Sequence, residues 1–177
     1  MLRIVITGAE STGKTTLTEA LSGYYGAPWT GEFVREFASG LDRPIRQSDL
    51  ETIAKGQLAQ ESLITAPEAP VLFHDTNILS SIIYANHYFD TILDWVNESF
   101  LSRPYDLYLL CLPDIPWTAE DGQRDSPEAR DTLHAKFKES LDTLKLPYVE
   151  ISGDEVERMG QAVQAIDARL NPDYAIG

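Results

Sequence analysis

Residues Gly8–Thr15 read GAESTGKT and directly follow the apolar run Leu2–Ile6. They match the phosphate-binding pattern G-x-x-x-x-G-K-[ST], in which a strand, a glycine-rich turn and a helix follow one another. Glycines at both ends of the turn let consecutive backbone N–H groups point inward and form an anion-binding nest. The helix that follows adds the positive end of its dipole. The stretch therefore predicts a P-loop for the phosphates of a nucleoside triphosphate.

The side chains of this loop have distinct expected roles. Lys14 is expected to reach the β- and γ-phosphates, and the Thr15 hydroxyl to take a Mg²⁺ position. ATP and Mg²⁺ are therefore the expected cofactors. The residues expected to contact ATP are Gly8, Glu10, Ser11, Thr12, Gly13, Lys14, Thr15, Thr16 and Arg130.

Length and composition indicate one globular domain over residues 1–177, with 43% hydrophobic residues. No apolar stretch approaches the roughly 18 residues that a membrane span needs. The apolar run Leu2–Thr7 is too short for a signal peptide. The single cysteine, Cys111, is expected in the core, which suits a cytoplasmic protein. A net charge of −14 argues against a nucleic-acid partner, and the oligomeric state is left open.

Hydrophobic periodicity predicts alternating strands and helices, and hence a three-layer α/β fold of the nucleotide-kinase-like P-loop NTPase type. Its five-stranded sheet is expected to be mainly parallel, with ligands beyond the carboxyl ends of the strands. Two Ser-x-x-Glu capping boxes, Ser48–Glu51 and Ser152–Glu155, are expected to open helices. The expected strands are 2–7, 29–34, 71–73, 106–112 and 148–151, and the expected helices are 14–24, 48 onward, 76–86, 91–101, 127 onward and 155–170.

Two carboxylates follow predicted strands. Asp75 stands where an acidic residue holds Mg²⁺ directly or through water, although it could also cap the next helix. Glu32 is the candidate base that accepts a hydroxyl proton during phosphoryl transfer. The alternative for Glu32 is a surface ion pair with Arg35. His74 has no visible ligand partners and is expected to be structural.

The polar segment 113–125 is expected to form part of a lid over about 113–130. Arg124 would place positive charge over the transferring group, unless it forms a surface ion pair with a neighbouring aspartate. Trp117 could stack on a flat substrate ring or anchor the base of the loop. The residues expected to contact the substrate are Glu32, Arg35, Gln57, Asp114 and Trp117, and those expected to be catalytic are Lys14, Glu32, Asp75 and Arg124.

Several motifs of other P-loop proteins do not occur in the sequence. The chain has no N-K-x-D to recognise guanine and no L-S-G-G-Q, and no glutamate follows Asp75. These differences argue against a GTPase and against a mechanical ATPase. They favour a kinase that acts on a small molecule.

Four segments resemble the ribosylnicotinamide kinase domain of the bacterial NadR proteins, in the same order and spacing: Gly8–Thr15, Glu32–Phe37, Phe73–Asn77 and Pro113–Arg124. The resemblance implies ATP-dependent phosphorylation of the ribose 5′-hydroxyl of nicotinamide riboside to nicotinamide mononucleotide. It also implies that Trp117 flanks the nicotinamide ring and that Arg124 is the lid arginine. The chain departs from the family at Asn77, where an aspartate is common. Its 177 residues also leave no room for the nucleotidyltransferase domain of multidomain members.

Two other functions are compatible with the same residues. One is a kinase for another nucleoside or small nucleotide, and the other is an ATP-binding regulatory module without turnover. The two carboxylates and the lid arginine favour an enzyme, because a sensor of nucleotide state needs neither a base nor lid charge.

Overall fold

The computed structural model describes residues 1–64, 68–117 and 127–171. Its five strands form one sheet in the order β2-β3-β1-β4-β5, and each neighbouring pair is parallel. The predicted fold class is therefore confirmed, with a sheet that is entirely parallel. The strands are β1 (Leu2–Thr7), β2 (Trp29–Thr30), β3 (Val71–Asp75), β4 (Leu107–Cys111) and β5 (Tyr148–Ile151).

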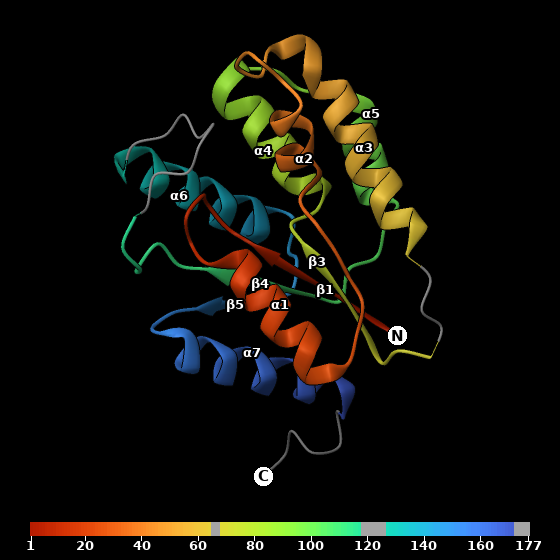
Figure 1. Cartoon of the computed structure of the whole chain (residues 1–177), viewed down its shortest axis with the longest axis vertical. Coiled ribbons are helices and arrows are strands. Elements are labelled where there is room, and N and C mark those ends of the chain that lie inside the picture. The colour runs from red at the N-terminus through yellow and green to blue at the C-terminus, as the bar shows by residue number, and fades with distance from the viewer. Residues whose placement is uncertain (65–67, 118–126, 172–177) are drawn as a thin grey trace.

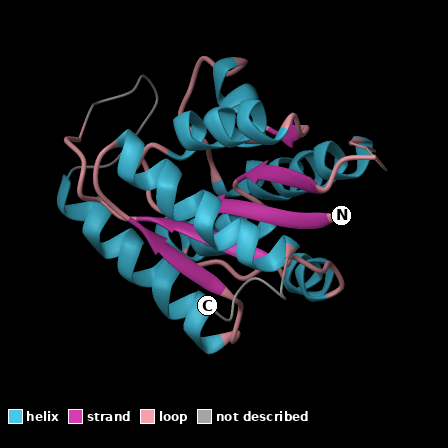
Figure 2. Cartoon of the chain, turned by 90° about the horizontal axis from the view of Figure 1, so that it is seen from below, coloured by secondary structure: helices cyan, strands magenta, loops and turns pink. Residues whose placement is uncertain are grey.

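Helices cover both faces of the sheet, which gives three layers (Figure 1, Figure 2). One face packs against α1 and α7, and the other packs against α3, α4, α5 and α6. None of the helices within the described ranges is long and apolar enough to cross a membrane. The helices are α1 (Lys14–Tyr25), α2 (Phe33–Ser39), the 3₁₀ turn η1 (Gln47–Asp49), α3 (Leu50–Leu63), α4 (Ile78–Phe89), α5 (Asp94–Leu101), α6 (Pro127–Thr143) and α7 (Glu155–Leu170).

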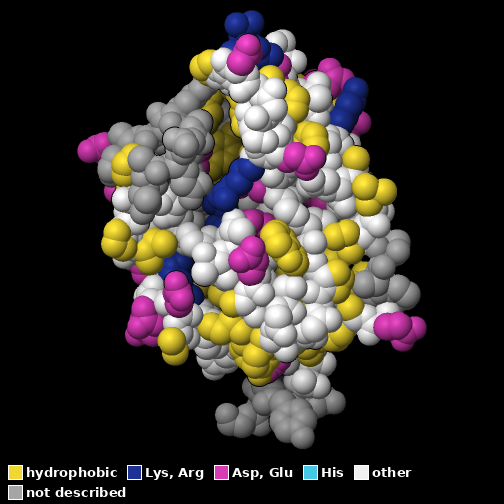
Figure 3. Space-filling view, viewed as in Figure 1, with side chains coloured by type: hydrophobic (Ala, Val, Ile, Leu, Met, Phe, Trp, Pro, Cys, Tyr) yellow, Lys and Arg dark blue, Asp and Glu magenta, His cyan; other side chains and the backbone are white. Residues whose placement is uncertain are grey.

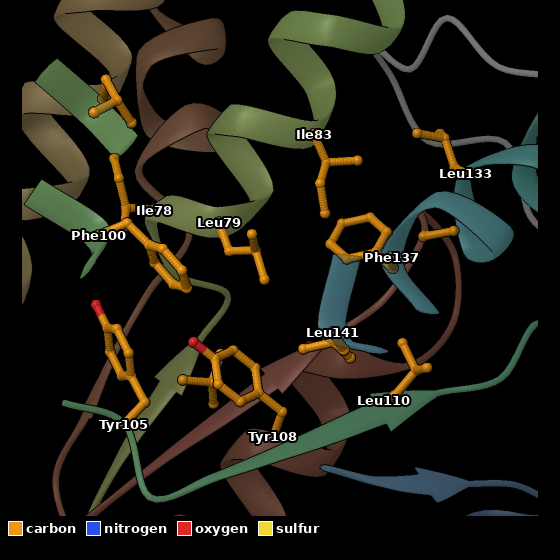
Figure 4. Packing of buried hydrophobic residues seen from close by; sticks show 14 residues of the cluster. Ile78, Leu79, Ile83, Phe100, Tyr105, Tyr108, Leu110, Leu133, Phe137 and Leu141 are labelled. Carbon is orange, nitrogen blue, oxygen red and sulfur yellow. The ribbon is translucent and has the colours of Figure 1, made fainter. Parts of the chain in front are cut away.

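The two cores follow from the alternation of side chains along the central strand. Ile4 and Ile6 of β1 enter the cluster beneath α1 and α7, whereas Val5 between them enters the cluster on the other face. A strand buried on both faces reads as a continuous apolar run, as β1 does. In the second cluster, Phe137 of α6 lies close to Ile83 of α4 (Figure 4). Cys111 is fully buried, as predicted.

The second strand is much shorter than predicted. The expected strand over 29–34 ends at Thr30, and helix α2 begins at Phe33. None of the residues of α2 is fully buried. Its apolar residues recur at helical spacing, but over seven residues this pattern is too short to distinguish a helix from a strand.

Both predicted capping boxes are wrong. Asp49 accepts the backbone N–H of Arg46 and closes the η1 turn, so α3 begins at Leu50 without a Ser48 cap. At α7 the cap is Asp154, whose carboxylate accepts the N–H groups of Val156 and Glu157. At α7 the aspartate takes the capping role because its charged oxygens accept stronger hydrogen bonds than a hydroxyl does, whereas α3 begins without a side-chain cap.

Helix α2 is held against α3 at one close contact. The ring of Phe33 lies over Gly56, where a Cβ would come within 2.0 Å of the ring atom Cε1. The backbone N–H of Phe33 also donates to Oε1 of the buried Gln57 at 3.0 Å. Gly56 thus leaves the space that allows α2 to approach α3.

This contact predicts opposite effects for the same substitution in two helices. Gly56→Ala should lower the free energy of unfolding by about 1–3 kcal/mol, because the new methyl group overlaps the Phe33 ring. Gly160→Ala in α7 meets open space and should raise it by about 0.5–1 kcal/mol through helix propensity. Urea unfolding measures both. A stabilising Gly56→Ala would contradict the packing of α2 on α3, and Phe33→Ala should partly rescue a destabilised one.

Candidate active site

The P-loop begins at a glycine that no other residue can replace without strain. Gly8 has φ +136°, and a Cβ there would lie 2.7 Å from the carbonyl oxygen of Cys111. Lys14 Nζ donates to the carbonyl of Ala9 at 2.8 Å, across the loop, and Thr12 Oγ1 donates to the same oxygen at 2.8 Å. Both side chains thus close the turn on one carbonyl oxygen, and Lys14 lies across the loop.

Asp75 and Thr15 meet at the end of β3. The Thr15 hydroxyl donates to Asp75 Oδ2 at 2.5 Å, and the other oxygen, Oδ1, is buried without a partner among the described residues. Burial, together with the negative charge of Glu32, raises the pKa of Asp75 above its usual range. A divalent cation would stabilise this carboxylate.

The donor set fits Mg²⁺. The described residues contain no cluster of three or more His, Cys, Asp or Glu side chains of the kind that forms a closed metal site. Mg²⁺ in phosphate-binding sites usually takes one or two protein oxygens and completes its shell with water and phosphate. The Thr15 hydroxyl and the unpaired oxygen of Asp75 offer such a pair.

Thr76, next to Asp75, has a strained backbone. Its φ of 63° lies in the left-handed region, which a β-branched residue rarely adopts. Its N–H donates to Ile6 O at 2.9 Å, which continues the β1–β3 pairing past the end of the strand. Strain of this kind persists where the surroundings impose it, often at functional sites. Here it turns the chain so that Thr76 faces a cavity.

The cavity has a volume of about 530 Å³ and opens beside the P-loop. This size falls in the range of small-molecule sites. Figure 3 shows a hollow on this face, with apolar side chains inside it and charged side chains near its mouth. Its polar and charged lining consists of Glu10, Glu32, Asp42, Arg43, Gln57, Thr76, Ser80, Ser81, Tyr84 and Tyr88, and its apolar lining of Val34, Ala38, Leu41, Pro44, Ile45, Leu50, Ile53 and Phe89.

Glu32 lies at the N-cap position of α2, between the cavity and the end of β3. Arg35 Nε donates to Glu32 Oε2 at 2.7 Å, so the predicted ion pair is present. This ion pair does not draw Glu32 away from the site. Glu32 also lines the cavity, and its charge acts on Asp75. The ion pair is therefore present at the cavity wall, and the role of Glu32 as a base stays a prediction.

The structure brings only part of the predicted substrate set to the cavity. Gln57 is buried and lines it together with Glu32. Arg35 does not line it but pairs with Glu32, which does. Half-buried Trp117 does not line it either, and Arg124 lies outside the described residues, as do positions 118–126 of the expected lid.

Asp114 is placed away from the cavity. Its carboxylate pairs with Arg158 of α7 and accepts the backbone N–H of Gly153 at 2.6 Å. These bonds join the ends of β4 and β5, and they keep the pKa of Asp114 low. The structure therefore gives Asp114 a structural position, unlike the expected contact with a substrate.

Two arginines hold the P-loop backbone from outside it. Arg158 donates to the carbonyls of Thr12 at 2.9 Å, Leu112 at 3.0 Å and Gly153 at 2.7 Å. Arg130 donates to Ser11 at 3.3 Å, Ile115 at 3.0 Å and Pro113 at 3.0 Å. Both are buried and tie adjacent P-loop residues to the segment after β4. Arg130 was expected to contact ATP, whereas Arg158 was not predicted and no sequence motif marks it.

Asn77, the departure from the NadR pattern, faces the protein interior. Its Nδ2 donates to the Tyr108 hydroxyl at 3.1 Å, and its Oδ1 caps α4 by accepting the N–H of Leu79 at 3.2 Å. It does not line the cavity, so its neutral side chain removes no charge from the cavity wall. His74 is also buried, with Nδ1 2.8 Å from Thr30 Oγ1, which agrees with a structural role. Burial lowers its pKa to about 3, so the imidazole is neutral.

The remaining residues expected to bind ATP lie together on or next to the P-loop. Thr16 is exposed in the first turn of α1, and Glu10 contributes to the wall of the cavity. The triphosphate site and the cavity are therefore adjacent. Glu32 and Asp75 lie between the cavity and Lys14 and Thr15 of the P-loop. A group held in the cavity would therefore approach these two P-loop residues past the two carboxylates.

Known proteins with similar sequences and structures include NadR. The trifunctional NAD biosynthesis/regulator protein NadR of Escherichia coli (strain K12) is 23% identical over 160 residues. These residues cover 87% of this chain and 39% of NadR, so the chain spans well under half of that relative's length. The predicted similarity to NadR is thereby confirmed.

Solved structures share the fold at low identity. NadR in complex with NR has a TM-score of 0.80 at 22% identity and covers 93% of this chain and 48% of that one. NadR with NAD and AMP-PNP has a TM-score of 0.82 at 22% identity, with 96% and 49% covered. Thymidylate kinase from Ehrlichia chaffeensis has a TM-score of 0.67 at 18% identity, with 93% and 98% covered.

A family model supplies the strongest assignment. Residues 3–158 match the model of the family described as AAA domain, from the first strand through the P-loop and the cavity to the arginine of α7. Since the match spans well over half of the sequence, the chain belongs to this AAA domain family of P-loop proteins.

Proposed function

We propose that this protein is a kinase that transfers the γ-phosphoryl group of ATP to the ribose 5′-hydroxyl of nicotinamide riboside. The observation that carries the proposal is the cavity beside the P-loop, where Glu32 lines the wall and Asp75 lies next to the phosphate end. NadR, which has the same fold, has been solved with NR and, in another structure, with AMP-PNP, and this supports the choice of substrate and donor.

The P-loop would bind the triphosphate through its backbone N–H groups and Lys14. Lys14 Nζ is 2.8 Å from the Ala9 carbonyl, and it would exchange this contact for phosphate oxygens. Thr15 and Asp75 would hold Mg²⁺, which supplies positive charge to the β- and γ-phosphates when it is bound. Arg130 and Arg158 fix the loop carbonyls, so the N–H groups on the same peptides point in defined directions.

Glu32 is the proposed base. The 5′-oxygen attacks the γ-phosphorus, the bond from that phosphorus to the β–γ bridging oxygen breaks, and ADP leaves with that oxygen. The hydroxyl proton passes to the Glu32 carboxylate. Arg35 keeps Glu32 oriented by its 2.7 Å hydrogen bond. Asp75 is less suited to this step, because its carboxylate already accepts the Thr15 hydroxyl and does not line the cavity. Arg124 is proposed to neutralise the charge on the transferring group.

A panel of acceptors tests the reaction directly. Purified protein with Mg·ATP should form ADP with nicotinamide riboside and much less with thymidine, cytidine or adenosine. Lys14→Ala, Glu32→Gln and Arg124→Ala should each lower kcat by at least ~10²-fold, as typical electrostatic and proton-transfer contributions indicate. Turnover with thymidine or cytidine instead would assign another nucleoside kinase, and ATP binding without turnover would indicate a regulatory module. Full activity of Arg124→Ala would refute the lid assignment.

The buried carboxylate of Asp75 is expected to lower the stability of the fold while the proposed reaction requires it. Its raised pKa means that ionising the buried carboxyl opposes folding, and this cost develops as the pH rises from its unfolded pKa of about 3.9 through the raised folded value. Asp75→Asn should therefore match the wild type near pH 3 and become the more stable protein by pH 7. Thermal unfolding without Mg²⁺ measures this gain, while the variant should lose turnover. A less stable Asp75→Asn at pH 7 would contradict the cost.

Loss of the Arg158 side chain is expected to weaken the binding of ATP and not that of the nucleoside. Arg158→Ala should raise the KM for ATP about tenfold and leave the KM for the nucleoside within about twofold, because the lost hydrogen bonds orient the P-loop. Arg169→Ala removes an exposed arginine from the same helix and serves as the control. Equal changes in both KM values would indicate general loosening of the fold. Urea unfolding should confirm that both variants are folded under assay conditions.

A further inference from the structure

The segment that carries Glu32 is held on both sides by buried side chains. Before Glu32, Thr30 Oγ1 lies 2.8 Å from Nδ1 of His74. After it, the backbone N–H of Phe33 donates to Oε1 of Gln57 at 3.0 Å. His74 and Gln57 are both buried, so these two contacts are sheltered from water. Glu32 therefore stands between two residues that buried side chains hold in place.

A second pair of buried side chains lies behind these two. The hydroxyl of Tyr105 donates to Oε2 of Glu61 at 2.7 Å. The ring of Tyr105 also meets the ring of His74 edge to face, with centroids 5.7 Å apart. Glu61 lies four residues after Gln57 on α3. Gln57, Glu61, His74 and Tyr105 thus form one buried polar cluster, in which Gln57 lines the cavity and the other three do not.

The hydrogen bond from Phe33 decides which way the Gln57 amide points. Only the oxygen of the amide can accept an N–H, so Oε1 faces α2 and the NH₂ group is left for another acceptor. Nε2 of Gln57 and Oε1 of Glu61 are both buried, and neither has a hydrogen-bond partner among the described residues. Side chains four residues apart share one face of a helix, so this donor and this acceptor are complementary neighbours. The Glu61 carboxylate therefore favours the amide orientation that Phe33 needs.

Charged and hydrogen-bonding neighbours offset the burial of Glu61. Its side chain is fully buried, and Oε2 lies 3.6 Å from a guanidinium nitrogen of Arg103 and 4.0 Å from one of Arg3. Burial raises the pKa of Glu61, whereas the Tyr105 hydroxyl, the two arginines and Gln57 act in the opposite direction. Tyr105 takes one of the two carboxylate oxygens, so the other is left to accept from Gln57. Loss of the Tyr105 hydroxyl would therefore loosen Glu61 and, with it, the Gln57 amide.

We infer that the buried polar cluster positions Glu32, and that Glu61 and Tyr105 act on the reaction through Gln57 and His74 without touching the acceptor. The inference rests on the proposed function, because it takes Glu32 as the base. Proton transfer depends steeply on the position of the base, so a shift of the α2 N-terminus lowers kcat. The P-loop is not part of the cluster, so ATP binding is unaffected. Glu61 and Tyr105 are thus positioning residues and not catalytic ones.

Two substitutions disturb the cluster and keep the size of its side chains. Tyr105→Phe removes one hydroxyl and keeps the ring, which packs against Phe100 and Tyr108 (Figure 4). Glu61→Gln places an NH₂ group where Gln57 needs an acceptor, because the Tyr105 hydroxyl still takes the remaining oxygen. Each should lower kcat with nicotinamide riboside about 10-fold and leave the KM for ATP within about twofold.

Tyr25→Phe is the matched control. It removes a hydroxyl that donates to Asp167 at 2.7 Å, where α1 meets α7 across the sheet from the cluster. This variant should change neither kcat nor the KM for ATP. Urea unfolding should confirm that all three variants are folded under assay conditions.

Hydrogen exchange at single amides measures the position of α2 without any turnover. The Phe33 amide should exchange about 10-fold faster in Tyr105→Phe and in Glu61→Gln, because its bond to Gln57 opens more often. The Ser152 amide donates to Oε1 of Gln161 at the same 3.0 Å and should keep its exchange rate. It therefore reports any general loosening of the fold.

The outcomes separate this inference from the proposed function. Unchanged exchange at Phe33, or equal acceleration at Phe33 and Ser152, would overturn the inference. Faster exchange at Phe33 together with full kcat in both variants would overturn it as well. Failure of the wild type to phosphorylate any nucleoside would refute the kinase. Faster exchange at Phe33 would then still support the positioning of the Glu32 segment by the cluster, and unchanged exchange would still contradict it.

Discussion

The close approach of Gly8 to the carbonyl oxygen of Cys111 is the constraint on which the site depends. Strands β1 and β4 are parallel neighbours, so the turn that leaves β1 must pass over the end of β4. A Cβ at Gly8 would lie 2.7 Å from that oxygen, which would push the turn away from the sheet. The arginines of α6 and α7 then tie the same turn to the residues that follow β4. The position of the phosphate-binding N–H groups is thus set by the sheet.

Two carboxylates near this turn have different environments, and this separates their roles. Asp75 is buried, and one of its oxygens has no partner within the described ranges, so its charge is costly until a cation binds. Glu32 is offset by Arg35 and lines the cavity. The charge of Glu32 contributes to the raised pKa of Asp75, so the two groups influence each other. Such a difference in environment supports the proposal that Asp75 is the metal ligand and Glu32 the base.

Local sequence patterns predicted the parts of the fold that local physics decides. The P-loop spacing, β1 and β5 were correct, because apolar runs and glycine turns act within a few residues. Helix α2 was missed because its apolar pattern spans only seven residues and because the contact of Phe33 with Gly56 of α3 cannot be recognised in the sequence. Arg158 was missed for a similar reason, since 146 residues separate it from Thr12. Asp75 lies beside the P-loop as expected, because the parallel sheet gathers strand ends at one edge, whereas Asp114 follows β4 and pairs with Arg158 of α7 instead.

The described residues form two regions, the P-loop region and the cavity region, that meet at the end of β3. The P-loop and the arginines of α6 and α7 form the first, whereas α2, α3, α4 and residues 41–45 surround the cavity. Asn77 caps α4 from the interior, so its departure from the NadR pattern alters neither region directly. Changes in α2–α4 can therefore alter the cavity wall while the P-loop and its two arginines stay intact, because a site is set by the side chains that a shared fold carries.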